Sequence, residues 1–516
     1  MSEADDAQRL ARERALIEDL SDPNNLPGSP RQIELARTHG SLVFLADDDV
    51  YKLKRAVDFG FFDFTTLAAR RADCDAELRP NRRTAADVYL DVLPIYADDD
   101  GFSMTRAHGE PVEWAVHMRR LPDDVRADVL LRTGRLDAGR VAELAAATAR
   151  FHREAEPHDS TFDALRTNIA ENFEQTRPMI GRHLDQATFD DLHAAQHAWL
   201  EKSSVRLASR PACDGHGDLR LEHVYFLDGG PVMIDCIEFN ERFRIADPAL
   251  DVAFLAMEAY REGRGDLAEV FLGAFAYESD DYEFYPIIDG YMSYRAFVRA
   301  KVAGFVADDP GTSAEVRTRK RDAAERQFEL ALDLLAPRDS ARIVAIGGLP
   351  GSGKSTVARA VRALLFGPII SADATRKHLA GVDKLAAAGA DAYTPEFSAR
   401  VLDEIVQRTD CVLASGRTAI VDTTFYSGDA LERVAKLAAD WQVPIDFIEC
   451  TAPVDVLRRR LRQREGDVSD ADTRVLDKFL ARRDRVALDA PVVHHLLDTD
   501  CDPNIVRESL VEWLLG

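Results

Sequence analysis

The spacing of hydrophobic and polar residues changes several times along this chain, and each change marks a structural segment. In the first 125 residues, short apolar runs end in turn residues, a pattern typical of β-strands. A charged segment with a helical period follows the second run and predicts an amphipathic helix over 65–84. The predicted strands are 42–45, 50–53, 88–96 and 113–118.

From about residue 126 the period becomes helical, and it continues to about residue 335 except for a break at 210–251. Helices are predicted over 136–153, 162–176 and 188–200. After residue 341 apolar runs alternate with helical segments, which predicts a parallel α/β sheet. Its predicted strands are 343–346, 368–371, 418–421 and 445–450.

Length and composition fit a globular protein with more than one domain. The 516 residues are 46% hydrophobic and 30% charged, which is enough for sizeable cores. We expect a helix and link, an α+β domain, a linker and an α/β domain. Their boundaries are 1–30, 31–336, 337–341 and 342–516.

The sequence shows no sign of export or membrane insertion. The opening segment is charged throughout, unlike a signal peptide, and no apolar run reaches about 18 residues. Six scattered cysteines without a C-x-x-C pair favour a reduced protein without structural zinc. We expect a cytoplasmic protein with no membrane partner, and the sequence leaves its oligomeric state open.

The net charge of −25 is unevenly distributed. Residues 338–516 hold 24 Lys+Arg and 27 Asp+Glu, so −22 lies on residues 1–337. This acidity either keeps the protein soluble or attracts a cationic substrate, and it argues against nucleic acid as a partner.

The most specific motif is GGLPGSGKST at 347–356, placed between an apolar run and a helical pattern. It matches the G-x-x-x-x-G-K-S phosphate-binding loop, whose glycines let backbone N–H groups point at phosphate. Lys354 is expected to reach the β- and γ-phosphates of ATP, and Ser355 to hold Mg²⁺. The residues expected at this nucleotide are Gly348, Gly351, Ser352, Gly353, Lys354, Ser355 and Thr356.

Residues 341–516 resemble P-loop kinases such as polynucleotide 5′-kinases, gluconate kinases and zeta toxins. Asp373 and Arg376 form the D-x-x-R element of that family after the second predicted strand. The resemblance implies that Asp373 accepts the proton of the acceptor hydroxyl and that Arg376 binds an anionic group of the substrate. Asp422 takes the Walker B position near Mg²⁺. A helix N-cap at Asp373 and a strand-end cap at Asp422 are the structural alternatives.

A basic run follows the fourth predicted strand, at the place where this family carries a lid helix. The resemblance implies that Arg460 and Arg464, which share a helix face, close over the phosphoryl group and the nucleotide. A solvated basic helix face is the alternative.

The break at 210–251 contains a second group of motifs. His216-Gly217-Asp218-Leu219 precedes His223, Asp235 ends an apolar strand, and D-P-A-L-D ends at Asp251. The group resembles H-G-D-L-H-x-x-N, I-D-F and D-P-x-x-D of aminoglycoside phosphotransferase-like kinases, relatives of the protein kinases. The resemblance implies that Asp218 is the catalytic base, that Asp235 holds Mg²⁺ and that Asp251 braces the loop.

Upstream features follow the same family order. Lys52, on a predicted strand, would hold the nucleotide phosphates and pair with Glu77, although Lys54 points to the same face and competes for this role. Residues 38–44 would cover the nucleotide, and 113–118 would touch the adenine. This resemblance implies a protein-kinase-like α+β fold before the α/β P-loop domain.

Two positions depart from the family pattern. His223 stands where the family has a metal-binding Asn, so His223 either reaches the metal or phosphate itself or weakens the second Mg²⁺ site. Cys236 replaces an aromatic residue. A non-catalytic kinase fold is therefore an alternative.

The whole chain resembles bacterial proteins that join an aminoglycoside phosphotransferase-like domain to an ATP-binding P-loop kinase domain. The resemblance implies a bifunctional phosphotransferase that uses ATP and Mg²⁺ and phosphorylates a hydroxyl of a small molecule, such as an amino sugar or aminoglycoside-like alcohol. The alternatives are a regulatory ATPase with a degenerate kinase-like domain, and polynucleotide or nucleotide-sugar kinase activity in the P-loop domain.

Overall fold

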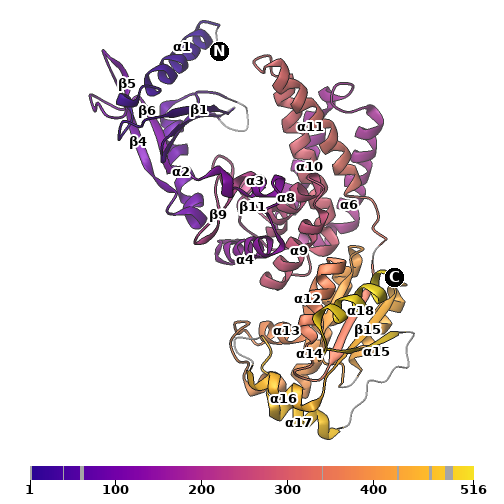
Figure 1. Ribbon diagram of the computed structural model, residues 1–516. Coiled ribbons are helices and arrows are strands. Elements are labelled where there is room, and N and C mark those ends of the chain that lie inside the picture. Colours follow the sequence, from indigo (N-terminus) through magenta and orange to yellow (C-terminus); the bar gives the residue numbers. More distant parts are fainter. Residues whose placement is uncertain are drawn as a thin grey trace. The chain divides into compact units, whose positions relative to one another are not determined.

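The computed structural model describes residues 3–38, 40–58, 63–339, 341–426, 429–463, 468–482 and 492–516 (Figure 1). The chain forms two compact units. The first comprises Met1–Glu143, Arg150–Leu165 and Ala208–Glu258, and the second comprises Leu144–Ala149, Arg166–Leu207 and Ala259–Gly516. The chain passes between the units several times, so neither unit is continuous in sequence.

The first unit begins with a six-stranded antiparallel sheet of order β1-β2-β3-β6-β4-β5. Helices α1 (Glu3–Leu20) and α2 (Leu67–Ala85) contribute apolar side chains to its core. Thr66 caps α2 by accepting the N–H of Ala69. The strands are β1 (Ile33–Arg37), β2 (Ser41–Ala46), β3 (Asp49–Lys54), β4 (Tyr89–Asp98), β5 (Gly101–Ser103) and β6 (Glu113–Arg119).

These elements confirm the strands and the helix predicted from the apolar runs. The interpretation of 38–44 as a covering loop was wrong for most of that segment, because residues 41–44 lie in β2 and pair with β3. Apolar alternation through Leu42 and Phe44, both buried, is the reason that the strand begins so early.

The rest of the first unit surrounds the break predicted at 210–251. A β-hairpin connects the segment containing Asp218 to Asp235. In a small three-stranded sheet of order β11-β8-β7, strands β7 and β8 precede that segment and β11 follows Asp235. The strands are β7 (Pro157–His158), β8 (Ala212–Asp214), β9 (Val224–Leu227), β10 (Gly230–Met233) and β11 (Ile245–Ala246). The helices are α3 (Ala127–Arg132), α4 (Ala138–Glu154), α7 (Glu241–Arg244) and α8 (Pro248–Arg261), of which α4 and α8 contribute to both units.

The second unit contains a helical part and a parallel sheet. Its helical part packs around α10, where Phe297 contacts Phe173 and Phe328 with ring centroids 4.6 and 5.2 Å away. The helices are α5 (Phe162–Thr176), α6 (Gln186–Ser209), α9 (Gly265–Ser279), α10 (Tyr285–Asp308) and α11 (Ala314–Asp333).

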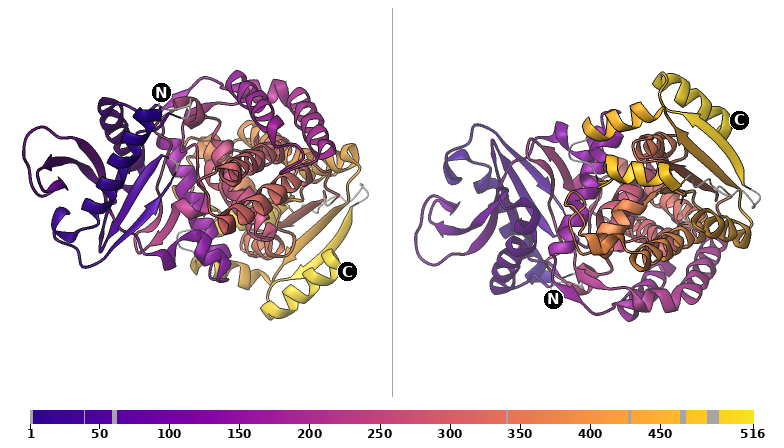
Figure 2. Two further views of the ribbon diagram at one scale, coloured as in Figure 1. Left: turned by 90° about the horizontal axis from the view of Figure 1, so that it is seen from above. Right: turned by 90° about the horizontal axis from the view of Figure 1, so that it is seen from below.

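The sheet has five parallel strands in the order β13-β14-β12-β15-β16. The alternating pattern predicted a parallel sheet and four of these strands, but not β16. Central strand β12 is buried along its whole length. Helix α18 lies beside α12 and β16 at the yellow end of the chain (Figure 2). The strands are β12 (Ile343–Gly348), β13 (Ile369–Ser371), β14 (Ala419–Asp422), β15 (Ile445–Thr451) and β16 (Val493–Asp498). The helices are α12 (Lys354–Leu365), α13 (Ala372–Leu379), α14 (Pro395–Ala414), α15 (Ala430–Trp441), α16 (Val454–Gln463), α17 (Thr473–Arg482) and α18 (Pro503–Leu515).

Within this unit the corner between α9 and α10 covers the β13 edge of the sheet. The hydroxyl of Tyr282 donates to the carbonyl of Ile369 at 2.7 Å, and this contact is buried. Arg417, whose side chain is only 4% exposed, pairs with Glu269 and Asp289 at 2.8 Å each. Buried charges of this kind require their partners, so the helical part and the sheet depend on each other.

Candidate active sites

Lys52 connects three distant elements of the first unit. Its Nζ lies 2.8 Å from Oε1 of Glu77 on α2 and 2.7 Å from Oδ1 of Asp235, which follows β10. The sequence left Lys52 and Lys54 as competitors; among the described residues Lys52 pairs with Asp235, whereas Lys54 pairs with other carboxylates. The structure therefore brings together the predicted lysine, glutamate and metal-binding aspartate.

Lys54 forms a more deeply buried cluster beside Lys52. It pairs with Asp73 at 2.7 Å, with Glu77 at 2.8 Å and closely with Glu238. Burial alone would lower the pKa of both lysines, but the facing carboxylates hold it well above the ordinary value. Burial also raises the pKa of Glu238 to about 7, against the opposing field of Lys54. Lys54 is therefore enclosed by carboxylates, which suits a role in holding the fold.

Asp251 holds the backbone of the loop that carries Asp218. Its carboxylate accepts the N–H of His216 at 2.8 Å and of Gly217 at 2.9 Å, and it contacts Nε2 of His152 at 3.1 Å. Gly217 has a φ of 85°, which an L side chain rarely adopts. This is the bracing geometry that the resemblance implied for Asp251.

His216 ties the same loop to the segment that leads to Asp235. Its Nε2 lies 3.0 Å from the carbonyl of Ile234 and donates to it. Burial lowers the pKa of His216 to about 4, so the imidazole is neutral at physiological pH.

Arg220 joins the predicted base to the predicted metal-binding position. Its Nε donates to Oδ2 of Asp218 at 2.9 Å, and one terminal nitrogen lies 3.0 Å from Nε2 of His223. That Nε2 is in turn 3.5 Å from Oδ2 of Asp235. Sequence reasoning did not single out Arg220, and its place two residues after Asp218 is the only signal that pointed to it.

Asp235 suits a divalent cation. Its side chain is 42% exposed, unlike that of its partner Glu77, and its backbone has a φ of 65°. The N–H of Asp235 donates to the hydroxyl of Tyr89 at 3.1 Å, which fixes this unusual conformation. An accessible carboxylate is a ligand that Mg²⁺ prefers.

The phosphate-binding loop of the second unit requires its glycines. Gly348, Gly351 and Gly353 have φ angles of 139°, 83° and 89°. A Cβ atom at Gly348 would lie 2.4 Å from the carbonyl oxygen of Cys450. Ser352 is buried, and its Oγ has no hydrogen-bond partner among the described residues. The loop therefore has the tight turn that its sequence predicted.

Ser355 and Asp422 meet beside this loop. Oγ of Ser355 donates to Oδ2 of Asp422 at 2.9 Å, and Nζ of Lys354 donates to the carbonyl of Leu349 at 3.3 Å. Burial raises the pKa of Asp422, and Lys354 opposes this shift. The oxygens of Ser355 and Asp422 are hard ligands of the kind that Mg²⁺ prefers, and the neighbouring Lys354 could pair with a phosphate bound to that ion.

The predicted acceptor residues lie at the start of α13. Ser371, not Asp373, is the N-cap of this helix, so the capping alternative for Asp373 is wrong. Arg376 donates to the carbonyl of Ala392 at 2.6 Å and stacks on the ring of Tyr393 with its guanidinium 4.9 Å from the centroid. The guanidinium is thereby held in one orientation.

Asp470 connects the segment after α16 to this acceptor region, a contact that the sequence did not indicate. It accepts from Nζ of Lys377 at 3.0 Å, from the N–H of Ala388 at 2.8 Å and from the hydroxyl of Tyr393 at 2.8 Å. Tyr393 therefore contacts both Arg376 and Asp470.

Arg460 lies next to the phosphate-binding loop, on α16. It donates to the carbonyl and hydroxyl oxygens of Thr499 at 2.8 and 3.0 Å and to the carbonyl of Gly351 at 3.4 Å. Its role at the phosphoryl group stays a prediction. Arg464 lies outside the described residues.

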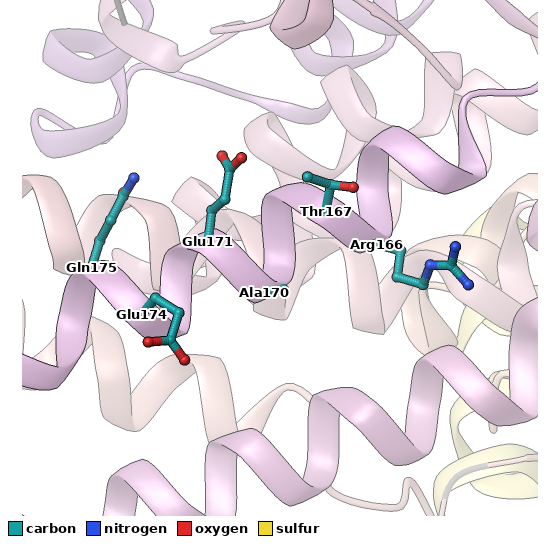
Figure 3. Close-up of a pocket in the computed structure, with 6 residues that line it drawn as sticks. All are labelled: Arg166, Thr167, Ala170, Glu171, Glu174 and Gln175. Carbon is teal, nitrogen blue, oxygen red and sulfur yellow. The ribbon is translucent and has the colours of Figure 1, made fainter. Parts of the chain in front are cut away.

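One cavity of the second unit belongs to neither group. It has a volume of about 430 Å³ and runs along α5 (Figure 3). Its lining side chains come from one helix and do not converge on a point (Figure 3). The lining residues are Arg166, Thr167, Ala170, Glu171, Glu174 and Gln175.

Among the described residues, no three His, Cys, Asp or Glu side chains form a metal-binding group of their own. No described helix has the length and hydropathy needed to span a membrane.

Two family models match the chain. Residues 89–287 match a phosphotransferase enzyme family, and residues 343–486 match an AAA domain. An antiparallel sheet with the Lys52–Glu77 pair, followed by a parallel sheet with a phosphate-binding loop, defines a two-domain protein of the kinase type. The predicted fold class is confirmed.

Two relatives match nearly the whole length of the chain and show the family to which it belongs. Uncharacterized proteins of Mycobacterium tuberculosis (strain H37Rv) and Mycobacterium bovis are each 31% identical over 470 residues, which cover 87% of this chain and 90% of theirs. The chain belongs to this family, in which a phosphotransferase-type domain precedes a P-loop kinase domain.

Solved structures resemble portions of the chain at low sequence identity. A choline/ethanolamine kinase family protein from Mesorhizobium loti is 12% identical with a TM-score of 0.40, over 62% of this chain and 99% of that one. A sugar kinase from Janibacter is 22% identical with a TM-score of 0.27, over 34% of this chain and 94% of that one.

Proposed function

We propose that this protein is an ATP-dependent phosphotransferase with two Mg²⁺–ATP sites, each of which transfers the γ-phosphate to a hydroxyl of a small molecule. The observation that carries the proposal is the contact of Ser355 with Asp422 beside the glycine-shaped loop. Hard oxygen ligands, backbone N–H groups and a lysine at one point are the requirements for binding a magnesium-bound triphosphate.

The first unit supports a second site of the same chemistry. A kinase site needs its lysine–glutamate pair and its metal-binding aspartate in place together, and Lys52, Glu77 and Asp235 satisfy this arrangement. Asp218, held on a loop braced by Asp251, would accept the proton of the substrate hydroxyl. Mg²⁺, when bound, would neutralise charge on the β- and γ-phosphates.

In the second unit, Lys354 would hold the phosphates and Asp373 would orient the acceptor hydroxyl. Arg376 and Arg460 would bind anionic oxygens, for which a planar guanidinium is suited. The acceptor of the first unit would be a cationic alcohol such as an amino sugar, because −22 of the net charge lies on residues 1–337.

Product analysis tests this proposal directly. The protein would be incubated with ATP, Mg²⁺ and a metabolite extract, and phosphorylated products would be identified by mass spectrometry. Asp218→Ala should remove one product and Lys354→Ala another. Products that are unchanged in both variants, or ATP consumption without any phosphorylated acceptor, would contradict the proposal.

One observation favours a second candidate function, a regulatory ATPase with a non-catalytic first unit. The carboxylate of Asp218 is already paired with Arg220 at 2.9 Å, which makes it a weaker base. In that case ATP would be hydrolysed only at the P-loop site. Loss of all ATP turnover in Lys354→Ala, with none lost in Asp218→Ala, would identify this function.

A further inference from the structure

Arg220 is an enclosed cation at the centre of the first candidate site. Its side chain is only 10% exposed, and it contacts Asp218, His223 and, closely, Glu222. A guanidinium stays charged at any physiological pH, so this positive charge is permanent. It lies between the predicted base and the predicted metal-binding position.

The hydrogen bonds of His223 determine which of its nitrogens has a free lone pair. Nδ1 lies 2.9 Å from the carbonyl oxygen of Asp218, and a carbonyl only accepts, so Nδ1 carries the proton. Nε2 of the neutral ring then accepts the N–H of Arg220 at 3.0 Å. The lone pair that a metal ion would need is therefore already used.

His223 consequently does not fit the metal ligand that its sequence position predicted. Protein kinases hold two Mg²⁺ ions with an aspartate and the loop Asn, and here the Asn position carries an imidazole bound to an arginine. A second divalent cation at His223 would also face the guanidinium charge at short range. Asp235, at the position where the family holds Mg²⁺, keeps a carboxylate that is 42% exposed.

We propose that the first unit binds ATP with a single divalent cation, held by Asp235, and that Arg220 supplies the positive charge of the missing second cation to the γ-phosphate. Three of the five N–H groups of Arg220 satisfy the three contacts above, and two are left for phosphate oxygens. This inference rests on the proposed function of the first unit.

Counting metal ions tests it without any acceptor. Full-length Lys354→Ala protein, in which the P-loop site is disabled, is titrated with Mn²⁺ and the non-hydrolysable analogue adenylyl imidodiphosphate, and bound Mn²⁺ is measured by electron paramagnetic resonance. We expect one Mn²⁺ per bound nucleotide. The double variant Arg220→Gln, His223→Asn in this background should bind two, with the spectral broadening of neighbouring ions.

Affinity provides the second readout. Arg220→Gln should weaken the triphosphate analogue about tenfold and leave ADP within about twofold, since only the γ-phosphate loses a charged contact. Arg31→Gln, at a side chain that is 93% exposed, is the matched control and should change neither. Arg220→Lys keeps the charge and should keep the count at one even if the glutamine variant does not fold.

The possible outcomes distinguish the role of Arg220 from the proposed nucleotide binding by the first unit. Two Mn²⁺ per nucleotide with Arg220 intact, or equal losses for the triphosphate and ADP, would overturn the role of Arg220 while the nucleotide site stands. Absence of nucleotide binding in the Lys354→Ala background would overturn both.

Discussion

The two candidate sites would bind phosphate by different means. The P-loop site uses the backbone of about ten consecutive residues, and its glycines are fixed by close contacts such as that of Gly348 with Cys450. The site of the first unit uses side chains brought together from far apart, since Lys52 and Asp235 are 183 positions apart in the sequence. A short motif can specify the P-loop site, whereas the site of the first unit depends on the whole fold of that unit.

The sites also differ in the state of their cations. Among the described residues, Nζ of Lys354 donates to a single acceptor, the carbonyl of Leu349 at 3.3 Å, and would be available to a phosphate. Lys52 is already paired with two carboxylates, those of Glu77 and Asp235. A nucleotide at the first site would therefore compete with these internal partners for Lys52, whereas the lysine of the P-loop site has no carboxylate partner in the part of the chain that the structure describes.

The largest expected effect concerns the base. Asp218→Asn should lower phosphoryl transfer by the first site about 10²- to 10⁴-fold, because an amide cannot accept the hydroxyl proton. Nucleotide binding and the product of the P-loop site should stay unchanged, which a coupled ADP assay and calorimetry can measure. Equal transfer rates in parent and variant would exclude Asp218 as the base.

A pH effect should follow from His216. Its pKa is lowered by burial from 6.5 to about 4, so its stabilising contribution is complete above pH 6.5 and is lost as the pH falls toward 4. The loss amounts to about 3 kcal/mol in the unfolding free energy. Denaturant unfolding of His216→Gln should be less sensitive to this pH range than that of the parent, and identical pH profiles would refute the assignment.

The two lysines should separate binding from stability. Lys52→Met leaves the fully buried Glu77 with one cation fewer and should lower the unfolding free energy by about 2 kcal/mol. Lys354→Met should change it by less than about 0.5 kcal/mol, since it loses a single carbonyl contact. Both variants should lose nucleotide affinity at their own site. Equal stability losses would show that the two sites do not differ in this way.

The smallest effect is expected at Asp422. A carboxyl whose pKa is raised by burial stabilises most at low pH and loses that contribution as the pH rises, so it weakens the empty protein at neutral pH. Asp422→Asn keeps an acceptor for Ser355 and should raise the unfolding free energy at pH 7 slightly. It should also abolish the gain in melting temperature from Mg²⁺ with nucleotide. A less stable empty variant would contradict this expectation.

The sequence predicted the elements well wherever the signal was local. Strand β12 and its loop follow from one motif. Strand alternation alone could not decide whether Lys52 or Lys54 is the lysine expected at the nucleotide phosphates. Arg220, Asp470 and β16 were missed for a common reason: the first two acquire their partners only through tertiary contacts, and the alternation in Val493–Asp498 is interrupted by two histidines. His223 shows the converse, because its sequence position suggested a ligand while its hydrogen bonds use the necessary lone pair.

The hydroxyl of Tyr282 has a practical consequence for anyone who produces the P-loop half alone. Strand β13 is an edge of its sheet. In a fragment that lacks the α9–α10 corner, the carbonyl groups of this strand would be exposed and could pair with another chain. A recombinant fragment that starts after α11 would also leave Arg417 without Glu269 and Asp289. Such a fragment should precipitate or form oligomers, and kinetic work on the P-loop site is best done on protein that retains α9 and α10.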